Sequence, residues 1–400
     1  MRILHLAYED PHQPGSGGGS VRTHEINRRL GARHEITALV AGYPGATIRQ
    51  EGGVRWKPLH PRTGTKIDRL AYFGALPAAI RAHPHDLLVE DFSAPFGPGF
   101  SPLFTRQPVV ASVQWLFAAH MRAKYHLPFD TVEQFGLRFY HDFIVVSDWV
   151  GNRVRARCPE SQVETIPNGI EPLAFTPRAA TPRHFLFVGR LDRQQKGGDL
   201  LLDSIARTVT LLGKRMPPLL IAGDGPDRAT MEQHAARLGI THLVQFLGRV
   251  EGEAKYRLMA NAHALLMPSR FETFGMVAVE AQAAGTPVVA FDVGPLASVA
   301  GGGGAQLVPA FDVEAFAQSA ATLITDTVLN AKVRQQGRAW ARQYDWDSLA
   351  ERQEQHYLAA IAAAKTRHHR LRAATAHTPP LTKAQRPSRD PNPTDTGIPV

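Results

Sequence analysis

The chain has a single cysteine, Cys158, among its 400 residues, which excludes an internal disulfide and any metal site built from several cysteines. It also lacks a run of about eighteen apolar residues, so no transmembrane helix is expected. The first residues, MRILHLAYEDP, have neither the basic flank nor the cleavage site of a secretory signal peptide. From these absences we expect a cytoplasmic protein.

Acidic residues are in deficit, since 36 Asp and Glu stand against 45 Lys and Arg and give a net charge of +9. This charge favours an anionic partner, such as a phosphate-bearing substrate, an anionic membrane surface or nucleic acid. Nucleic acid ranks last of the three, because no recognition helix or aromatic-basic module accompanies the charge. Part of the charge lies in the tail after Lys365, which is rich in Pro, Arg, His and Thr and is predicted to be disordered.

The length and a hydrophobic content of 44% suit two cores and therefore two domains. The chain opens with a strand pattern at residues 3–8, a glycine-rich loop at Pro14–Ser20, a helical pattern and a second strand at 35–42. This order predicts a doubly wound parallel sheet. Ser20 takes the last glycine position of a dinucleotide fingerprint, and the second strand ends in VAG instead of a ribose-binding acid, so NAD is not expected.

Further strand patterns at residues 86–90, 108–113 and 143–147 continue the first domain, and each ends where polar residues begin. In parallel sheets the carboxyl ends of the strands line the ligand crevice. The segment TIPNGIEP, at residues 165–172, contains an Asn-Gly turn between two prolines, and we place the hinge just after it. A second series of strands then begins at residues 185–188.

Two glutamates, Glu272 and Glu280, lie at either end of a loop-to-helix transition between apolar runs at 262–267 and 287–293. Thr273 is predicted to cap this helix. The first N–H groups of a helix can bind a phosphate, and carboxylates on either side can accept hydrogen bonds from sugar hydroxyls. The alternative is a capping loop followed by a solvated helix glutamate.

Two cations, Arg190 and Lys196, flank a short loop between the strand at 185–188 and a helix for which Asp199 is the predicted cap. Cations at a strand-to-helix junction suit a diphosphate, because charge-assisted bonds to phosphate are strong and leaving-group charge must be neutralised. Either residue alone would be interpreted as a solvated loop charge. Both together, beside the glutamate pair, favour a donor phosphate site.

The spacing of Glu272 and Glu280, with the FGM turn and the AAGTPVV exit, resembles the E-x7-E signature of retaining glycosyltransferases, above all glycosyltransferase family 4. GRLDRQQKGG is similar to the family's GRLxxxKG motif, and TIPNG matches its hinge turn. The resemblance covers residues 1 to about 362. It implies an α/β fold of the GT-B type, in which two Rossmann-like doubly wound domains face each other across a cleft. The implied parts are an acceptor domain at 1–172, a nucleotide-sugar donor domain at 173–345, a helix at 346–364 that crosses back to the first domain, and the basic tail at 365–400.

The resemblance implies transfer of a sugar from a nucleotide-diphosphate sugar to a hydroxyl of a glycan, a lipid-linked acceptor or a small molecule, with retention and without a cofactor or metal. Arg190, Lys196 and Glu272 are the expected catalytic residues. Glu280 would hold the ribose, and backbone groups near Val250 would line the nucleobase pocket. The expected donor-binding set is Gly18, Gly19, Arg190, Lys196, Val250, Glu272, Phe274, Gly275, Met276 and Glu280.

On the acceptor side, Gln114 stands where family 4 enzymes have a histidine, and its amide can orient a hydroxyl but cannot exchange a proton. Two other functions stay open: a nucleotide-sugar epimerase, which would share the fold, and a catalytically inactive nucleotide-sugar-binding protein, which Gln114 favours. Basic and aromatic residues alternate between residues 121 and 157, which predicts either solvated helix faces or peripheral contact with an anionic membrane. The D-x-D pattern at Asp345–Asp347 is interpreted as a helix start and not as a metal site.

Overall fold

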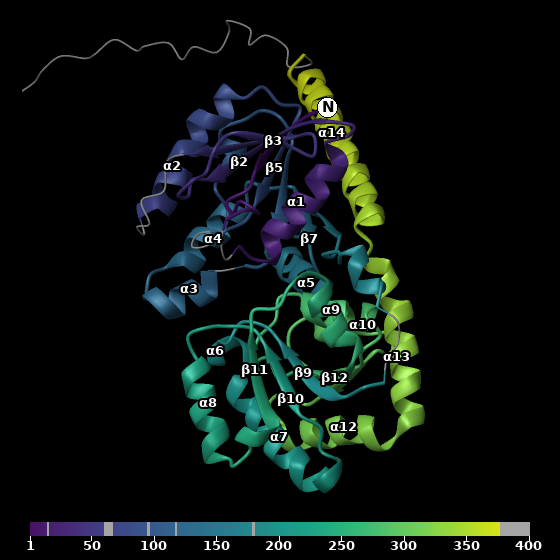
Figure 1. The fold of residues 1–400 in the computed structure, drawn as a ribbon. Helices are drawn as coiled ribbons and strands as arrows, with labels where there is room; N and C mark the ends of the chain where they lie inside the picture. Colours follow the sequence, from purple (N-terminus) through teal and green to yellow (C-terminus); the bar gives the residue numbers. More distant parts are fainter. Residues whose placement is uncertain (14–15, 60–66, 94–96, 117, 178–180, 377–400) are drawn as a thin grey trace, which may run out of the picture.

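A computed structural model describes residues 1–13, 16–59, 67–93, 97–116, 118–177 and 181–376 of the chain. Two α/β domains lie one above the other, and the last two long helices run along one side of them (Figure 1). Within the described residues, no helix is both long enough and apolar enough to cross a lipid bilayer. The prediction of two domains with parallel sheets is confirmed.

The first domain is built on an eight-stranded sheet with the order β3-β4-β2-β1-β5-β6-β7-β8, and its pairs are parallel except for β3 with β4. The central strand β6 is buried along its whole length and is largely apolar, as expected where helices cover both faces of a parallel sheet. Its strands are β1 (Arg2–Leu6), β2 (Glu35–Ala41), β3 (Arg49–Glu51), β4 (Val54–Leu59), β5 (Leu87–Asp91), β6 (Val109–Val113), β7 (Asp142–Val145) and β8 (Gln162–Thr165), and its helices are α1 (Gly18–Leu30), α2 (Ile67–Ala82), α3 (Ala118–Tyr125), α4 (Phe129–Leu137) and α5 (Asp148–Arg157), with a 3-10 turn η1 (Ser101–Leu103).

The second domain contains a six-stranded parallel sheet with the order β11-β10-β9-β12-β13-β14. Its strands are β9 (His184–Val188), β10 (Leu219–Ala222), β11 (Val244–Gly248), β12 (Ala262–Met267), β13 (Val288–Phe291) and β14 (Ala305–Val308), and its helices are α6 (Arg193–Lys196), α7 (Gly198–Leu212), α8 (Arg228–Arg237), α9 (Gly252–Ala260), α10 (Met276–Ala283), α11 (Leu296–Val299), α12 (Val313–Thr325) and α13 (Thr327–Ala341), with 3-10 turns η2 (Pro172–Phe175), η3 (Gly213–Arg215), η4 (Thr241–Leu243) and η5 (Arg342–Tyr344). The first sheet ends at Thr165 and the second begins at His184, and the predicted limits at 172 and 345 stay predictions.

The last helix, α14 (Trp346–Ala376), packs against α1 of the first domain (Figure 1). Trp346 and Tyr357 are fully buried in the same apolar cluster as Ile3 and Ile26 of the first domain. At the surface, Arg33 forms an ion pair with Glu354. The C-terminal helix therefore completes the core of the first domain.

The predicted end of this helix is wrong. The tail was expected to begin at residue 365, but the helix extends to Ala376. The sequence from Trp346 to Ala376 contains neither glycine nor proline, so nothing in the backbone stops the helix at the predicted point. Residues 377–400 of the predicted tail, and Pro14 and Gly15 of the predicted glycine loop, lie outside the described residues.

Candidate functional site

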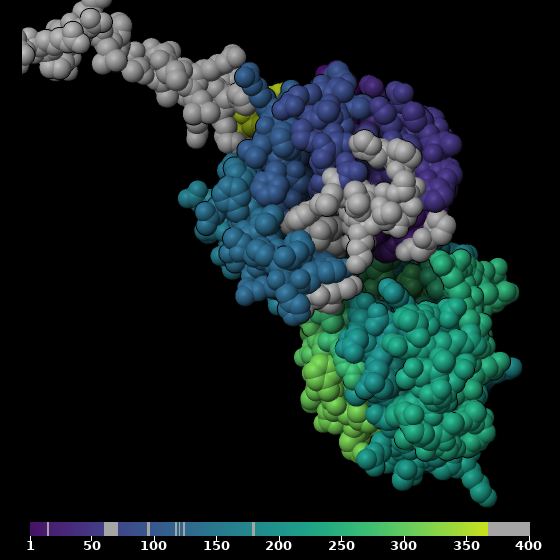
Figure 2. Space-filling view, turned by 90° about the vertical axis from the view of Figure 1, so that its left-hand side faces the viewer, coloured from purple at the N-terminus to yellow at the C-terminus, as the bar shows by residue number. Residues whose placement is uncertain are grey.

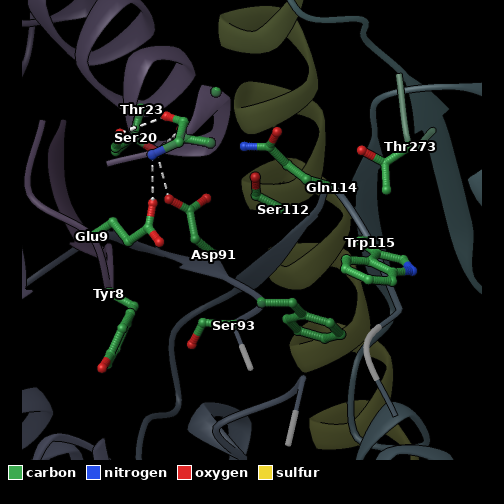
Figure 3. A pocket seen from close by; sticks show the side chains of 14 residues that line it. Tyr8, Glu9, Ser20, Thr23, Asp91, Ser93, Ser112, Gln114, Trp115 and Thr273 are labelled. Atoms are coloured by element: carbon green, nitrogen blue, oxygen red, sulfur yellow. Dashed lines mark hydrogen bonds between the residues drawn. The ribbon is translucent and has the colours of Figure 1, made fainter. Parts of the chain in front are cut away.

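A cavity of about 320 Å³ lies between the domains, where β1, β5 and β6 of the first sheet end (Figure 3). Figure 2 shows the recess between the two domains from the side. The second domain contributes Thr273 to the lining. Of the predicted site residues, the cavity brings together Gly18, Gly19 and Gln114. The full lining is Tyr8, Glu9, Gly17, Gly18, Gly19, Ser20, Thr23, Asp91, Phe92, Ser93, Ser112, Gln114, Trp115 and Thr273.

Two helices begin at this cleft without a capping side chain. α1 follows Gly17 and α10 follows Gly275, and glycine has no side-chain oxygen to accept from the first N–H groups. The backbone oxygen of Gly275 accepts from the N–H of Ala278, at 2.9 Å. An added Cβ at Gly18 would lie 2.8 Å from Met276 Sδ, so the two helix starts face each other at close range. Their free N–H groups make this a suitable place for an anion. The prediction that Thr273 caps α10 is wrong, because the chain enters the helix two residues later, at Gly275, whose φ is +93°.

Lys196 and Glu272 form a partly buried ion pair at the second-domain side of the cleft. Lys196 Nζ lies 2.6 Å from Glu272 Oε1, and Ser269 Oγ donates to the same oxygen at 2.8 Å. Gly197, with φ +65°, lets α6 lie against this segment, since an added Cβ would collide with the carbonyl oxygen of Pro268. In the described part of the chain, Oε2 of Glu272 has no hydrogen-bond partner, which leaves it able to accept a bond from a ligand hydroxyl.

Asp199 connects the two segments that carry this ion pair. Arg270 donates to both carboxylate oxygens of Asp199, at 2.7 and 2.8 Å, and Arg193 donates at 2.9 Å. Burial opposes ionisation of Asp199, but the bonds from Arg270 and Arg193 outweigh it and lower its pKa from 3.8 to about 2. The prediction that Asp199 caps α7 is wrong, because the helix begins one residue earlier, after Gly197.

Glu280 lies in the second turn of α10 and is 8% exposed. Lys255 Nζ of α9 lies 3.0 Å from its Oε1. Burial raises the pKa of Glu280, and the positive charge of Lys255 opposes that rise. Phe274 points into the core, where its ring packs edge-on against Tyr344 at 5.8 Å, so only its backbone can reach a ligand.

Arg190 and Val250 follow the carboxyl ends of β9 and β11. The Arg190 side chain is exposed, and among the described residues it has no ion-pair or hydrogen-bond partner. Val250 is half-buried. Both therefore lie at the edge of the second sheet that faces the cleft, where a ligand would be expected.

Gln114 directly follows β6 on the first-domain side of the cavity. Its Oε1 accepts a hydrogen bond from Asn168 Nδ2 at 3.3 Å. Its amide nitrogen points toward α1, where an added Cβ at Gly19 would lie 2.9 Å away (Figure 3). The structure thus places an amide N–H, instead of an imidazole, at the wall of the cavity.

Two family models match consecutive parts of the chain. The model described as Glycosyltransferase Family 4 matches residues 16–172, and the model described as Glycosyl transferases group 1 matches residues 173–340. The chain belongs to glycosyltransferase family 4. The two matches meet between residues 172 and 173, directly after the segment 165–172 where the sequence predicts the hinge.

Curated relatives of this family 4 chain include a phosphatidyl-myo-inositol mannosyltransferase of Mycobacterium leprae, 34% identical over 226 residues, which are 54% of this chain and 59% of the relative. A D-inositol 3-phosphate glycosyltransferase of Jonesia denitrificans is 36% identical over 171 residues, which are 41% of this chain and 40% of the relative. The chain thus spans about 40% to 60% of the length of these relatives.

Solved structures share the fold. A sucrose-phosphate synthase from Thermosynechococcus elongatus has a TM-score of 0.75 and 22% identity, covering 90% of this chain and 99% of its own. Anabaena HepE in complex with UDP and glucose has a TM-score of 0.67 and 19% identity, and the match covers 89% of this chain and 98% of HepE. These likenesses support the predicted GT-B fold for the family 4 chain.

Several cavity residues of this family 4 chain were missed by sequence reasoning. Glu9 follows β1, and Asp91 is the last residue of β5. Glu9 Oε2 accepts a hydrogen bond from the N–H of Gly17 at 3.1 Å. Burial opposes ionisation of Asp91, but the charge of His5 and hydrogen bonds from His5, Thr23 and Ser112 lower its pKa below the ordinary value. The polar residues at the ends of the first strands were the signal that could have identified both carboxylates.

The predicted stretch of basic and aromatic residues does not form one surface in the family 4 fold. Trp149 is half-buried and turns toward the second domain, where its ring lies 6.5 Å from that of Phe271, and Met121 is buried. Trp115 also packs against Phe271, at 4.8 Å between ring centroids. Trp149 therefore faces the second domain, and contact of the stretch with a membrane stays a prediction.

The D-x-D pattern begins α14, as predicted. The N–H of Ser348 donates to Asp345 Oδ2 at 3.0 Å, and Asp347 pairs with Arg29 of α1. Among the residues the structure describes, no group of three or more His, Cys, Asp or Glu side chains is arranged to hold a metal ion. That the reaction needs no metal stays a prediction.

Proposed function

We propose that the chain is a retaining glycosyltransferase that moves a sugar from a nucleotide-diphosphate sugar to an acceptor hydroxyl. The observation that carries the proposal is the Lys196–Glu272 ion pair, held beside two uncapped helix starts that face each other across the cleft. A cation and free N–H groups suit a diphosphate, and a carboxylate beside them suits sugar hydroxyls. The mannosyltransferase and glycosyltransferase names of the matched relatives support the same activity.

The donor lies against the second domain in this proposal. Arg190 and Lys196 neutralise the diphosphate, and the amides of Phe274, Gly275 and Met276 bond to phosphate or sugar. Glu272 accepts from sugar hydroxyls, and Glu280 accepts from the ribose. The remaining donor contacts are backbone groups near Val250, which line the nucleobase pocket, and Gly18 and Gly19 at the start of α1.

In the proposed reaction, the bond between the anomeric carbon and the diphosphate oxygen breaks while the acceptor oxygen bonds to the same face of that carbon. The leaving diphosphate takes the acceptor's proton, so retention needs no protein nucleophile. Positive charge at Arg190, Lys196 and the helix starts stabilises the negative charge that develops on the diphosphate. Gln114 contributes no proton transfer, since its amide does not titrate.

A donor screen tests the proposal. We expect one member of a panel of UDP-glucose, GDP-mannose and ADP-glucose to raise the melting temperature, because a ligand that binds only the folded state stabilises it. The same donor should then be consumed with release of its nucleoside diphosphate when a hydroxyl acceptor such as myo-inositol or D-inositol 3-phosphate is present. Proton NMR of the product should show the anomeric configuration of the donor, with and without EDTA.

The alternatives predict different products. An epimerase inverts the sugar at C2 without an acceptor, and an inactive binding protein is stabilised by a nucleotide sugar but neither transfers nor hydrolyses it. A product of inverted anomeric configuration would contradict retention. Loss of turnover in EDTA would contradict metal independence.

We also propose that the first domain contacts an anionic membrane through an apolar rim. The rim comprises Leu103, Tyr125, Leu127 and Phe135, whose side chains are 42% to 55% exposed on η1, α3, α4 and the segment between the two helices. The exposed side chain of Arg138 lies just beyond the end of α4. Apolar side chains beside a cation favour insertion at an anionic interface.

The membrane proposal predicts co-sedimentation of the chain with phosphatidylglycerol vesicles but not with phosphatidylcholine vesicles. Changing Leu127 and Phe135 together to serine should lower the bound fraction several-fold, because each loses apolar surface that the bilayer would bury. Val328→Ser is the matched control, since Val328 is 79% exposed on α13 of the second domain. Unchanged binding of the double variant would show that the rim is a solvated surface.

A further inference from the structure

A buried arginine in α1, Arg22, ties together three distant parts of the chain. Its Nη1 donates to the backbone oxygens of Ile166 and Pro167 at 3.0 and 2.7 Å, and to Asn168 Oδ1 at 3.3 Å. Its Nη2 donates to Gln353 Oε1 of α14 at 2.6 Å. The side chain therefore connects the start of the first domain, the hinge segment and the C-terminal helix.

Burying a charged guanidinium costs free energy, so its presence in the core suggests a role beyond packing. Arg22 is 2% exposed, and each of its hydrogen-bond partners is a neutral carbonyl or amide oxygen. Burial lowers the pKa of Arg22 to about 10, which still leaves it protonated near pH 7. A charge is thus held in the core, one helical turn behind Gly18 and Gly19 of the cleft.

The direction of every hydrogen bond in this network follows from Arg22, because a guanidinium only donates. Asn168 must turn its Oδ1 to Arg22, so its Nδ2 faces Gln114. Gln114 must in turn present its Oε1 to Asn168, at 3.3 Å, and its nitrogen then points into the cavity (Figure 3). The amide orientation of Gln114 is thereby set by a residue of α1.

We propose that Arg22 and Asn168 are positioning residues that hold Gln114 with its N–H groups toward the cavity, where Gln114 donates a hydrogen bond to a substrate oxygen. This inference rests on the proposed glycosyl transfer. It assigns Gln114 the role of a fixed donor, in contrast to the proton-exchanging side chain that a histidine would supply. Glu9 and Asp91, on the same cavity, accept from substrate hydroxyls.

If the network only stabilised the fold, a substitution that preserved the fold would leave kcat unchanged. The positioning role predicts a loss of kcat even when the fold is preserved. Asn168→Asp separates the two, because aspartate still accepts from Arg22 and keeps the hinge tied to α1. It cannot donate to Gln114, so Gln114 must turn its nitrogen to the new carboxylate and present its oxygen to the cavity. The fold is kept while the donor at the cavity becomes an acceptor.

The experiment measures release of nucleoside diphosphate from the donor that the wild-type chain turns over, together with the dissociation constant of the free nucleotide by calorimetry. We expect Asn168→Asp to lower kcat about tenfold to a hundredfold, the loss expected when a substrate oxygen loses its donor. The KM for the donor and the nucleotide affinity should change less than about twofold, because the nucleotide lies in the other domain. In the Gln114→Ala background, Asn168→Asp should add less than about a twofold loss, since it acts through Gln114.

Asn152→Asp is the matched control, because Asn152 also accepts a bond from an arginine, Arg155, but lies exposed on α5. It should keep the wild-type rate. Gln114→Glu is a second variant that keeps the size of the side chain and removes the donor, and it should lose as much kcat as Asn168→Asp. Wild-type kcat in Gln114→Glu, or losses that multiply in the double variant, overturn the inference while glycosyl transfer stands. A wild-type chain that binds no nucleotide and turns over no donor overturns both.

Discussion

Changing Lys196 to methionine lowers kcat about a hundredfold to a thousandfold, the loss typical for removal of one group that stabilises charge in a transition state. Methionine replaces the aliphatic part of the lysine side chain and lacks only the ammonium group, so α6 is expected to retain its packing. The ammonium group that lies 2.6 Å from Glu272 is lost, and with it the positive charge that the proposed function assigns to the departing diphosphate. The measurement is the steady-state rate of nucleoside diphosphate release with the donor identified by thermal shift.

Lys214→Met provides the matched control for this prediction. Lys214 is exposed in η3, beyond the far end of α7, and this fifteen-residue helix places it roughly 22 Å from Lys196. The control should turn over donor at the wild-type rate. A Lys196→Met variant with more than about a tenth of the wild-type kcat would remove Lys196 from the catalytic residues.

Changing Trp346 to alanine lowers the free energy of unfolding by about 3 to 5 kcal/mol, as expected for truncation of a buried tryptophan. Trp346 is 1% exposed and fills the space beside Gly169, where an added Cβ would collide with its ring. Its indole N–H has no hydrogen-bond partner among the described residues, so the loss is one of packing. Urea unfolding followed by circular dichroism measures it.

Leu358→Ala is the control on the same helix, because Leu358 is 46% exposed. Its effect should stay within about 0.5 kcal/mol of wild type, as for most surface substitutions. If Trp346→Ala unfolded at the wild-type urea concentration, α14 would not contribute to the core of the first domain. Because alanine is the best helix former, neither variant loses helix propensity, and the contrast between them measures the effect of burial.

Much of the fold could be predicted, because parallel strands buried on both faces leave long apolar runs in the sequence. The strand predicted at 262–267 has the observed limits of β12. The hairpin of β3 and β4 was missed, since the edge strand β3 has only three residues and both strands are partly polar. Gly52 and Gly53, both with positive φ, form the turn that joins them.

The two wrong helix caps show why local patterns were not enough. Thr273 and Asp199 have side chains that cap helices well, but in each case glycine occupies the capping position. Gly275 and Gly197 allow close approach to Leu296 and Pro268, contacts between distant segments that no local pattern contains. Tertiary packing therefore decided both helix starts.

The pairing of site residues also depended on contacts distant in sequence. Sequence motifs identified Lys196 and Glu272 as site residues. They did not predict that the two side chains form an ion pair with each other. Arg22 belongs to none of the motifs that resemble family 4. Its hydrogen bonds to Asn168 and Gln353 join residues that are 146 and 331 positions apart in the sequence. Such a network becomes visible only when the folded chain brings its members together.

The position of α14 has a consequence for synthesis of the chain on the ribosome. Residues Trp346 to Tyr357 belong to the core of the first domain, but they emerge only after the whole second domain has been translated. At roughly 5 to 20 residues per second, the first domain waits on the order of 10 to 40 s for its last helix. During that time the face that α14 covers is exposed to chaperones. The domain translated first is therefore completed last, and a stop codon just before Trp346 would leave the core of the first domain incomplete.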